Sequence, residues 1–420
     1  MLRADDLWGR YQQVRNATET LAAPLSAEDQ QLQSMPDCSP TKWHRAHTTW
    51  FFEEFVLTPR GVTPVHPSYG YLFNSYYEAV GPRHERPRRG MLSRPSADEI
   101  AAYRRTVDGR MGELLSGADE ATRRELAPIL ALGLAHEEQH QELLLTDILH
   151  AFSGHPLRPA YRGAPPSVAS DGGARARGDT SSTRWLEHGG GLVEVGFAGE
   201  GFAFDNEGPR HRVWLEPFAL ADRPITVGEV RAFMADGGYA TPSLWLSEGM
   251  AWVRREQIEA PGYWQREGDA WRVFGLDGLR TLDDDEPAGH LSYYEADAIA
   301  RYLGGRLPTE AEWEVLASSG DPSVGNFRDD GALCPRPPAR RGGLFGDVWQ
   351  WTSSAYAAYP RFAAAPGAVG EYNGKFMVNQ MVLRGGSCLT PRGHVRATYR
   401  NFWPAPTRFQ MTGARVARDV

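Results

Sequence analysis

The sequence lacks several features that would assign it at once to a broad class. No run of about 18 apolar residues occurs, so we expect no membrane-spanning helix. The N-terminal stretch MLRADDLWGRYQQVRNATETL carries charges throughout and has no apolar core of the kind found in signal peptides. Only three cysteines occur, far apart in the chain, and they do not suggest a disulfide framework. These absences favour a soluble protein of the reducing cytoplasm.

An excess of positive charge is also missing. The formal net charge is −8 and the basic runs are short, so nucleic acid is disfavoured as the main partner. Hydrophobic residues make up 41% and charged residues 23%, as in ordinary globular proteins. A chain of 420 residues exceeds one ordinary core, which favours two domains. Most of the glycine and tryptophan follows residue 185, so the two halves should fold by different rules.

The N-terminal half has the periodicity of α-helices. Apolar residues recur at helical spacing in four segments, Leu7–Leu21, Trp43–Leu57, Ile100–Leu115 and Leu126–Phe152. Four such segments predict an antiparallel four-helix bundle, which we place at residues 1–155. The connection from about residue 59 to 96 is long and rich in proline, glycine, tyrosine and arginine, which is more typical of a functional loop than of an idle one.

The C-terminal half follows another pattern. Residues 156–188 have the proline, glycine, serine and alanine content of a linker. Residues 189–420 contain short, glycine-bounded strands and three helices opened by capping boxes, which begin at Thr226, Ser292 and Thr309. The predicted fold class is therefore α+β, with a helical domain followed by an irregular domain rich in loops.

The strongest local signal is His136-Glu-Glu-Gln-His140 in the last helical segment. Residues four apart lie on one face of a helix, so both imidazoles can reach one metal ion. The surrounding residues are strongly apolar, which places the pair near the interior of the bundle. The same five residues fit the H-E-x-x-H signature of zinc peptidases, with Glu137 as the base. That alternative needs a third ligand downstream, and Leu143 stands where the extended signature requires glycine.

A third histidine upstream offers a different metal site. Trp43-His-Arg-Ala-His47 lies in the second helical segment, and a bundle brings two such helices face to face. Three neutral imidazoles leave coordination positions open, as a catalytic metal requires. Either His44 or His47 could be the third ligand, and the spacing alone does not choose between them.

At this point the chain resembles a known family, the hercynine sulfoxide synthases of ergothioneine biosynthesis. SMPDCSPTKWHRAHTTWFFEEFVL, YLFNSYYEAVGPRHERPRRG and AHEEQHQELLL are similar to the DinB-like helical domain of these enzymes. RLPTEAEWEVLA, GDVWQWTSSAY, GEYNGKFMVNQMVLRGGSC and RATYRNFW resemble the formylglycine-generating-enzyme fold, a variant of the C-type lectin architecture. The resemblance covers nearly the whole chain in order, so it is more specific than any single motif.

The resemblance implies a metal and a reaction. The family holds Fe(II) on three histidines, which here correspond to His47, His136 and His140, and this favours His47 over His44. It uses dioxygen to join a thiol to the imidazole carbon of hercynine (Nα-trimethylhistidine) and oxidises the sulfur to a sulfoxide. Tyr76 and Tyr77 resemble the active-site tyrosines of one branch of the family, where a tyrosine can supply a proton or hydrogen atom during catalysis.

The resemblance also implies residues that bind the substrates. Three of them lie in the second domain, 189–420, and two, Gln139 and Arg86, lie in the helical domain. Asn401, Phe402 and Trp403 correspond to the place that holds hercynine, and aromatic faces attract quaternary ammonium groups. Gln139 could hydrogen-bond the substrate imidazole. Arg86 is our candidate for binding the carboxylate of the sulfur donor. For Arg83, Arg88 and Arg89, a role as solvated charges of a basic loop is at least as good an interpretation.

The sulfur donor and the function class leave alternatives open. The branch that uses γ-glutamylcysteine has an acidic residue where this chain has Trp403, which points toward free cysteine. A selenoneine synthase shares the architecture but takes a selenosugar. A zinc peptidase, or a lectin-like binding protein with a structural metal, would be a protein of another class. The sequence does not predict the oligomeric state.

Overall fold

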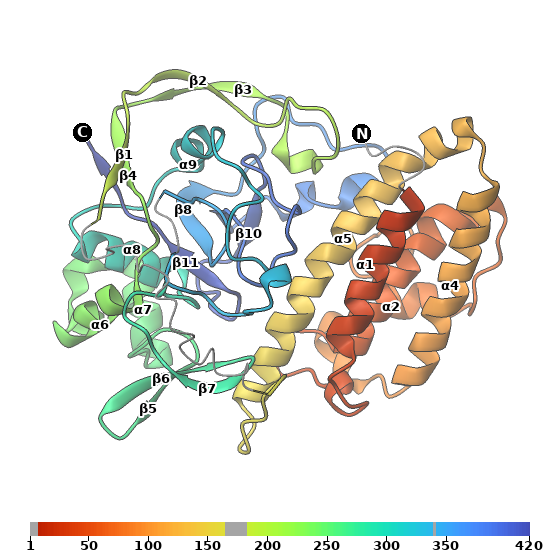
Figure 1. The fold of residues 1–420 in the computed structure, drawn as a ribbon, viewed down its shortest axis with the longest axis horizontal. Helices are drawn as coiled ribbons and strands as arrows, with labels where there is room; N and C mark the ends of the chain where they lie inside the picture. Colours follow the sequence, from red (N-terminus) through yellow and green to blue (C-terminus); the bar gives the residue numbers. More distant parts are fainter. Residues whose placement is uncertain (1–6, 164–182, 339–341) are drawn as a thin grey trace, which may run out of the picture. The chain divides into compact units, whose positions relative to one another are not determined.

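The computed structural model describes residues 7–163, 183–338 and 342–420 (Figure 1). The chain divides into two compact units, and each is described by itself. The helical unit comprises 1–161 together with two later segments, 199–205 and 363–374, and the second unit comprises 162–198, 206–362 and 375–420. The predicted boundaries at 155 and 188 stay a prediction, and most of the predicted linker, 164–182, lies outside the described residues.

Four long helices and one short helix build the helical unit. They are α1 (Leu7–Ala22), α2 (Thr41–Phe52), α3 (Tyr69–Phe73), α4 (Ala97–Gly117) and α5 (Glu120–Ser153). A single π-helical turn, Glu53–Leu57, continues α2. The four long helices run through the segments predicted from periodicity, and the DinB-like bundle is confirmed as the fold of this part.

Helix α2 is the centre of the bundle. All of its residues are buried, and it packs against α4 and α5. A helix that is buried on every side needs close neighbours, and α5 approaches at Gly133. A Cβ atom at that position would lie 2.7 Å from the rings of both Phe51 and Phe52. Glycine therefore permits the contact between α2 and α5 that brings their histidines together.

The described residues of the second unit form short strands and four α-helices. The helices are α6 (Val227–Ala235), α7 (Ser247–Glu256), α8 (Tyr293–Tyr302) and α9 (Glu310–Ala317). The capping boxes predicted at Thr226, Ser292 and Thr309 are all present, at the starts of α6, α8 and α9. Helix α7 was not predicted, because no side chain caps its first turn.

The strands among the described residues of this unit form four small sheets. One contains β1 (Trp185–His188), β4 (Phe218–Ala221) and β12 (Ala417–Asp419), in the order β1-β4-β12. The largest sheet has the strand order β10-β9-β8-β11. Its strands are β8 (Trp349–Ala355), β9 (Met381–Arg384), β10 (Asn401–Trp403) and β11 (Thr412–Ala414). Within this sheet β8 and β11 pair in parallel, and the other two pairs are antiparallel. The others are the pair β2 (Gly191–Val195) and β3 (His211–Leu215), and the sheet of β5 (Trp264–Glu267), β6 (Ala270–Gly275) and β7 (Gly278–Thr281). This confirms the predicted α+β class and the formylglycine-generating-enzyme-like second part.

Candidate metal centre

Three histidines converge inside the helical unit. His47 comes from α2, and His136 and His140 come from α5. Each offers one nitrogen, and these three atoms lie within 4.8 Å of one another. His47 and His136 are buried and His140 is half-buried. The arrangement has the size of a site for one metal ion, while the role of the three as ligands stays a prediction.

The hydrogen bonds of His47 show which of its nitrogens is available. Its Nδ1 lies 2.6 Å from the carbonyl oxygen of Phe73. A carbonyl oxygen can only accept, so Nδ1 carries the proton and Nε2 keeps its lone pair. That Nε2 lies 3.1 Å from Nε2 of His136. Two nitrogens therefore face one point, as they would around a shared ion.

The buried environment keeps the three imidazoles neutral. Burial lowers the pKa of His47 and His140 well below the usual value, and it lowers the pKa of His136 to about 3. Only a neutral imidazole has a lone pair for a metal ion. Neutral nitrogen donors suit first-row transition metals, whereas magnesium and calcium prefer oxygen. The donor set thus fits a divalent transition metal such as Fe(II).

His44 lies beside this cluster. Its Nδ1 is 2.8 Å from Nδ1 of His140, and its Nε2 is 3.0 Å from Oδ2 of Asp147. The same Asp147 oxygen accepts a hydrogen bond from the backbone N–H of Ser39 at 2.8 Å. Sequence reasoning missed Asp147, although its position seven residues after His140 on α5 places it on the same helical face.

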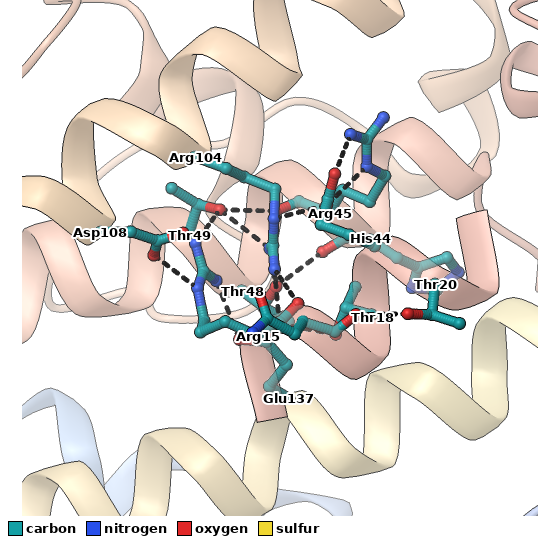
Figure 2. A network of polar contacts seen from close by, with 12 residues as sticks. Arg15, Thr18, Thr20, His44, Arg45, Thr48, Thr49, Arg104, Asp108 and Glu137 are labelled. Atoms are coloured by element: carbon teal, nitrogen blue, oxygen red, sulfur yellow. Dashed lines mark hydrogen bonds and ion pairs between the residues drawn. The ribbon is translucent and has the colours of Figure 1, made fainter. Parts of the chain in front are cut away.

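Glu137 cannot serve as the base of a zinc peptidase. Its carboxylate is fully buried and accepts hydrogen bonds from Arg15 and Arg104, both at 2.8 Å, and from Thr18 at 2.6 Å (Figure 2). A general base needs a lone pair within reach of the metal-bound reactants. Both oxygens of Glu137 are instead engaged by groups from α1 and α4.

The two predicted catalytic tyrosines are connected to the histidines through one intervening aromatic ring each, Trp50 for Tyr77 and Tyr372 for Tyr76. The hydroxyl oxygens of Tyr76 and Tyr77 are 3.5 Å apart. The ring of Tyr77 packs against Trp50, which in turn stacks on His47 with ring centroids 5.8 Å apart. Burial raises the pKa of both phenols, so each keeps its proton at neutral pH. A buried phenol that keeps its proton can act as a donor.

A third tyrosine joins them from the segment 363–374. The ring of Tyr372 lies 5.6 Å from that of His136 and 6.0 Å from that of Tyr76, between centroids. Its hydroxyl donates a hydrogen bond to Oε1 of Gln139. The neighbouring Glu371 accepts hydrogen bonds from the backbone N–H groups of residues 78 and 79, at 2.9 and 2.8 Å. These bonds hold the segment 363–374 next to the loop that carries Tyr76 and Tyr77.

Tyr372 also lines a cavity of about 690 Å³ in the helical unit. Ala131 and Leu132 of α5 and Phe202 and Phe204 of the segment 199–205 lie around it. Phe204 stacks on Tyr372 with ring centroids 5.4 Å apart. Cavities of this size and largely apolar character bind small molecules.

The arginines of the long loop differ in exposure. Arg86 is exposed and donates a hydrogen bond to the carbonyl oxygen of Asp37. Arg89 is buried, contrary to the interpretation of a solvated loop, and its guanidinium lies 3.4 Å from the centroid of the Trp43 ring. Trp43 stacks on His47 with centroids 4.6 Å apart. No carboxylate lies within ion-pair distance of Arg89 in the part of the chain that the structure describes.

The remaining predicted residues, Asn401, Phe402 and Trp403, form β10 in the second unit. Phe402 stacks on Tyr356 with ring centroids 3.9 Å apart and planes 10° from parallel. Trp403 meets Phe409 edge to face at 5.3 Å. All three are half-buried, so each presents some surface to a ligand.

Comparison with known proteins covers both halves of the chain. Residues 10–144 match the DinB superfamily, and residues 173–336 match the sulfatase-modifying factor enzyme 1-like domain. The hercynine oxygenase of Mycolicibacterium thermoresistibile is 32% identical over 97% of this chain and 93% of its own. That of Mycobacterium tuberculosis is 32% identical over 92% of each chain. Ergothioneine biosynthesis protein 1 of Neurospora crassa is 24% identical over 78% of this chain and 47% of its own.

Fold, site and relatives together define a metal-dependent enzyme that uses dioxygen. Its two parts are a helical bundle that carries the histidines and a formylglycine-generating-enzyme-like domain. The chain belongs to the hercynine oxygenase family. Among the described residues, no helix is both long and apolar enough to cross a membrane.

Proposed function

We propose that this chain is a hercynine sulfoxide synthase that uses Fe(II) and free cysteine. The overall reaction joins the cysteine sulfur to the imidazole carbon between the two ring nitrogens of hercynine. Cysteine and hercynine each lose one hydrogen, one oxygen atom of O2 becomes the sulfoxide oxygen, and the other leaves as water. The observation that carries the proposal is the cluster of three neutral histidines in a unit that also holds the buried Tyr77 and the half-buried Tyr76, in a chain of this family.

His47, His136 and His140 would hold the iron, which supplies the activation of dioxygen and of the thiol when bound. Three imidazoles leave positions open for both substrates, so much of the acceleration comes from holding the sulfur near the ring. The protein's own contribution begins with this positioning.

The tyrosines would manage protons. Tyr76 and Tyr77 keep their hydroxyl protons at neutral pH and are one aromatic ring away from the histidines, so one of them could donate a proton or hydrogen atom during oxygen reduction. Tyr372 holds Gln139 through a hydrogen bond to its amide oxygen. The amide nitrogen of Gln139 would then donate to the substrate imidazole.

Recognition of the two substrates would use different parts of the chain. Phe402 and Trp403, together with Asn401, would bind the trimethylammonium and carboxylate of hercynine. Arg86 would bind the carboxylate of cysteine. The buried guanidinium of Arg89, which has no carboxylate partner among the described residues, adds positive charge near the same loop.

Trp403 is the basis for free cysteine as the donor. An indole cannot accept a hydrogen bond from the ammonium group of a γ-glutamyl moiety, and an unpaired buried polar group costs about 1–3 kcal/mol. Since about 1.4 kcal/mol corresponds to a factor of ten, we expect a preference for cysteine over γ-glutamylcysteine of at least about tenfold in kcat/KM.

Anaerobic loading of the purified protein with Fe(II) or Zn(II), followed by oxygen uptake with hercynine and cysteine, tests the proposal. We expect uptake and a product with the mass of hercynylcysteine sulfoxide only in the iron-loaded protein. Turnover sustained by zinc and not by iron would contradict it. γ-Glutamylcysteine in place of cysteine is the matched donor control, and a better rate with it would overturn the donor assignment.

A further inference from the structure

The pair of His44 and Asp147 lies one step outside the three-histidine cluster. Asp147 is 6% exposed and follows His140 by seven residues on α5, while His44 precedes His47 by three residues on α2. Both helices that carry the cluster therefore also carry one member of this pair. The three groups form a chain of contacts, Asp147 to His44 to His140.

The direction of each hydrogen bond follows from Asp147. A carboxylate oxygen only accepts, so Nε2 of His44 carries a proton and donates it across 3.0 Å. We take the other nitrogen of His44, Nδ1, as an acceptor. The atom 2.8 Å away is Nδ1 of His140, which must donate. The proton of His140 is thus placed on Nδ1, and its lone pair on Nε2.

The other two histidines show why this placement matters. Nδ1 of His47 donates to the carbonyl of Phe73, so His47 is supported by the backbone. Nδ1 of His136 has no hydrogen-bond partner in the described part of the chain. His140 is the histidine of the cluster whose tautomer is set by another side chain.

We propose that His44, held by Asp147, is a positioning residue that fixes the tautomer and ring orientation of His140 so that His140 binds the metal through Nε2. The inference deepens the proposed function, since it concerns the same metal site. Partners that accept the distal N–H of a ligating histidine fix its tautomer, and their loss weakens metal binding by about 10–100-fold.

Two substitutions of His44 separate positioning from packing. In His44→Asn, the side-chain amide occupies the place of Nδ1 and can offer an oxygen to His140, but it does not reach Asp147. In His44→Gln, the amide occupies the place of Nε2 and can still donate to Asp147, but it leaves His140 without an acceptor. Glutamine is also closer to histidine in length. A purely structural role therefore predicts that His44→Gln is the milder change, whereas the proposal predicts the opposite order.

Anaerobic titration with Co(II), followed through its ligand-field absorption, measures the affinity without turnover. We expect Kd to rise about 10–100-fold in His44→Gln and clearly less in His44→Asn. His150→Gln is the matched control, because His150 is a half-buried histidine of α5 that is not among the three clustered histidines and whose Nδ1 contacts Ser34 at 2.7 Å. Its affinity should stay at the parental value. Equal losses of Co(II) affinity in the two His44 variants, or a smaller loss in His44→Gln than in His44→Asn, would overturn the proposal.

The tautomer itself can be read from the Zn(II)-loaded protein labelled with ¹⁵N-histidine. Long-range ¹H–¹⁵N correlations should show His140 protonated at Nδ1 and bound through Nε2. Binding through Nδ1 of His140, or His44 bound as a fourth ligand, would refute the inference. If instead the parental protein binds Co(II) with the expected order of variants but shows no iron-dependent turnover, the proposed function fails while this inference stands.

Discussion

Substitution of Glu137 by glutamine should destabilise the helical unit strongly. The change keeps the shape of the side chain and removes one buried negative charge. Arg15 and Arg104, both almost fully buried, each lie 2.8 Å from a Glu137 oxygen (Figure 2). The new amide N–H₂ would face one of these guanidinium groups, so a donor would meet a donor. Loss of one partner from a buried ion pair costs about 3–5 kcal/mol.

The remaining carboxylates compensate only in part. Arg15 also lies 2.8 Å from Asp108, and Arg104 lies 2.7 Å from Glu19. The side chains of Asp108 and Glu19 are 32% and 41% exposed, so solvent screens both interactions. We therefore expect a loss near the lower end of that range, about 3 kcal/mol.

Hydrogen exchange of peptides from α5, combined with urea unfolding, measures this loss in the helical unit alone. A global midpoint is insufficient because the chain has two units. Glu125→Gln is the matched control: it lies on the same helix, and its side chain is 71% exposed in a pair with Arg60. It should cost less than about 1 kcal/mol. A Glu137→Gln effect no larger than that of the control would refute the reasoning.

The pH dependence of stability gives a second test of the role of the Glu137 carboxylate. Burial alone would raise the pKa of Glu137, but Arg15 and Arg104 outweigh it and lower the pKa to about 2. A carboxyl whose pKa is lowered in the folded state stabilises the fold above its unfolded pKa, near 4.5, and loses this contribution as the pH falls through about 2. The stability difference between the parental protein and Glu137→Gln should be constant above pH 5 and shrink below about 4.5.

The other predictions concern the site itself. His136→Ala should abolish stoichiometric iron binding, measured by metal analysis after anaerobic loading, because two imidazoles remain; retained binding would exclude His136 as a ligand. Of Tyr76→Phe and Tyr77→Phe, one should shift the product from sulfoxide toward oxidised thiol while oxygen uptake persists; parental product ratios in both would assign the loop to packing. Arg86→Ala should raise KM for cysteine much more than KM for hercynine, and equal changes in steady-state kinetics would contradict its role.

Periodicity and capping predicted most of the helices, because both signals are local. The four bundle helices follow apolar spacing, and Thr226, Ser292 and Thr309 each cap a helix as expected. Helix α7 escaped prediction because its N-cap is Leu246, which offers no side-chain acceptor. The π-helical turn after α2 was not predicted either, because the spacing of apolar residues does not distinguish it from the α-helix before it.

The site was predictable only where it follows one helical face. The spacing of His136 and His140 places them together, and the same face continues to Asp147. Tyr372 could not be placed in this way, because it lies more than 200 residues further along the chain in a segment without regular spacing. Its contact with Gln139 arises from tertiary folding, since the segment 363–374 joins the helical unit. Arg89 was misread for a similar reason: it is buried and lies against Trp43, a residue of α2 far from it in the sequence.

The two faces of α5 explain how one short motif fits two chemistries. In an α-helix each residue turns about 100° from the one before, so Glu137 points away from the stripe that carries His136 and His140. That other direction meets Arg15 of α1 and Arg104 of α4. A buried carboxylate held by guanidinium groups from two helices allows α5 little freedom to rotate or slide. Both oxygens of the glutamate in the H-E-x-x-H pattern are therefore engaged by this charge network, on a different side of α5 from the two histidines.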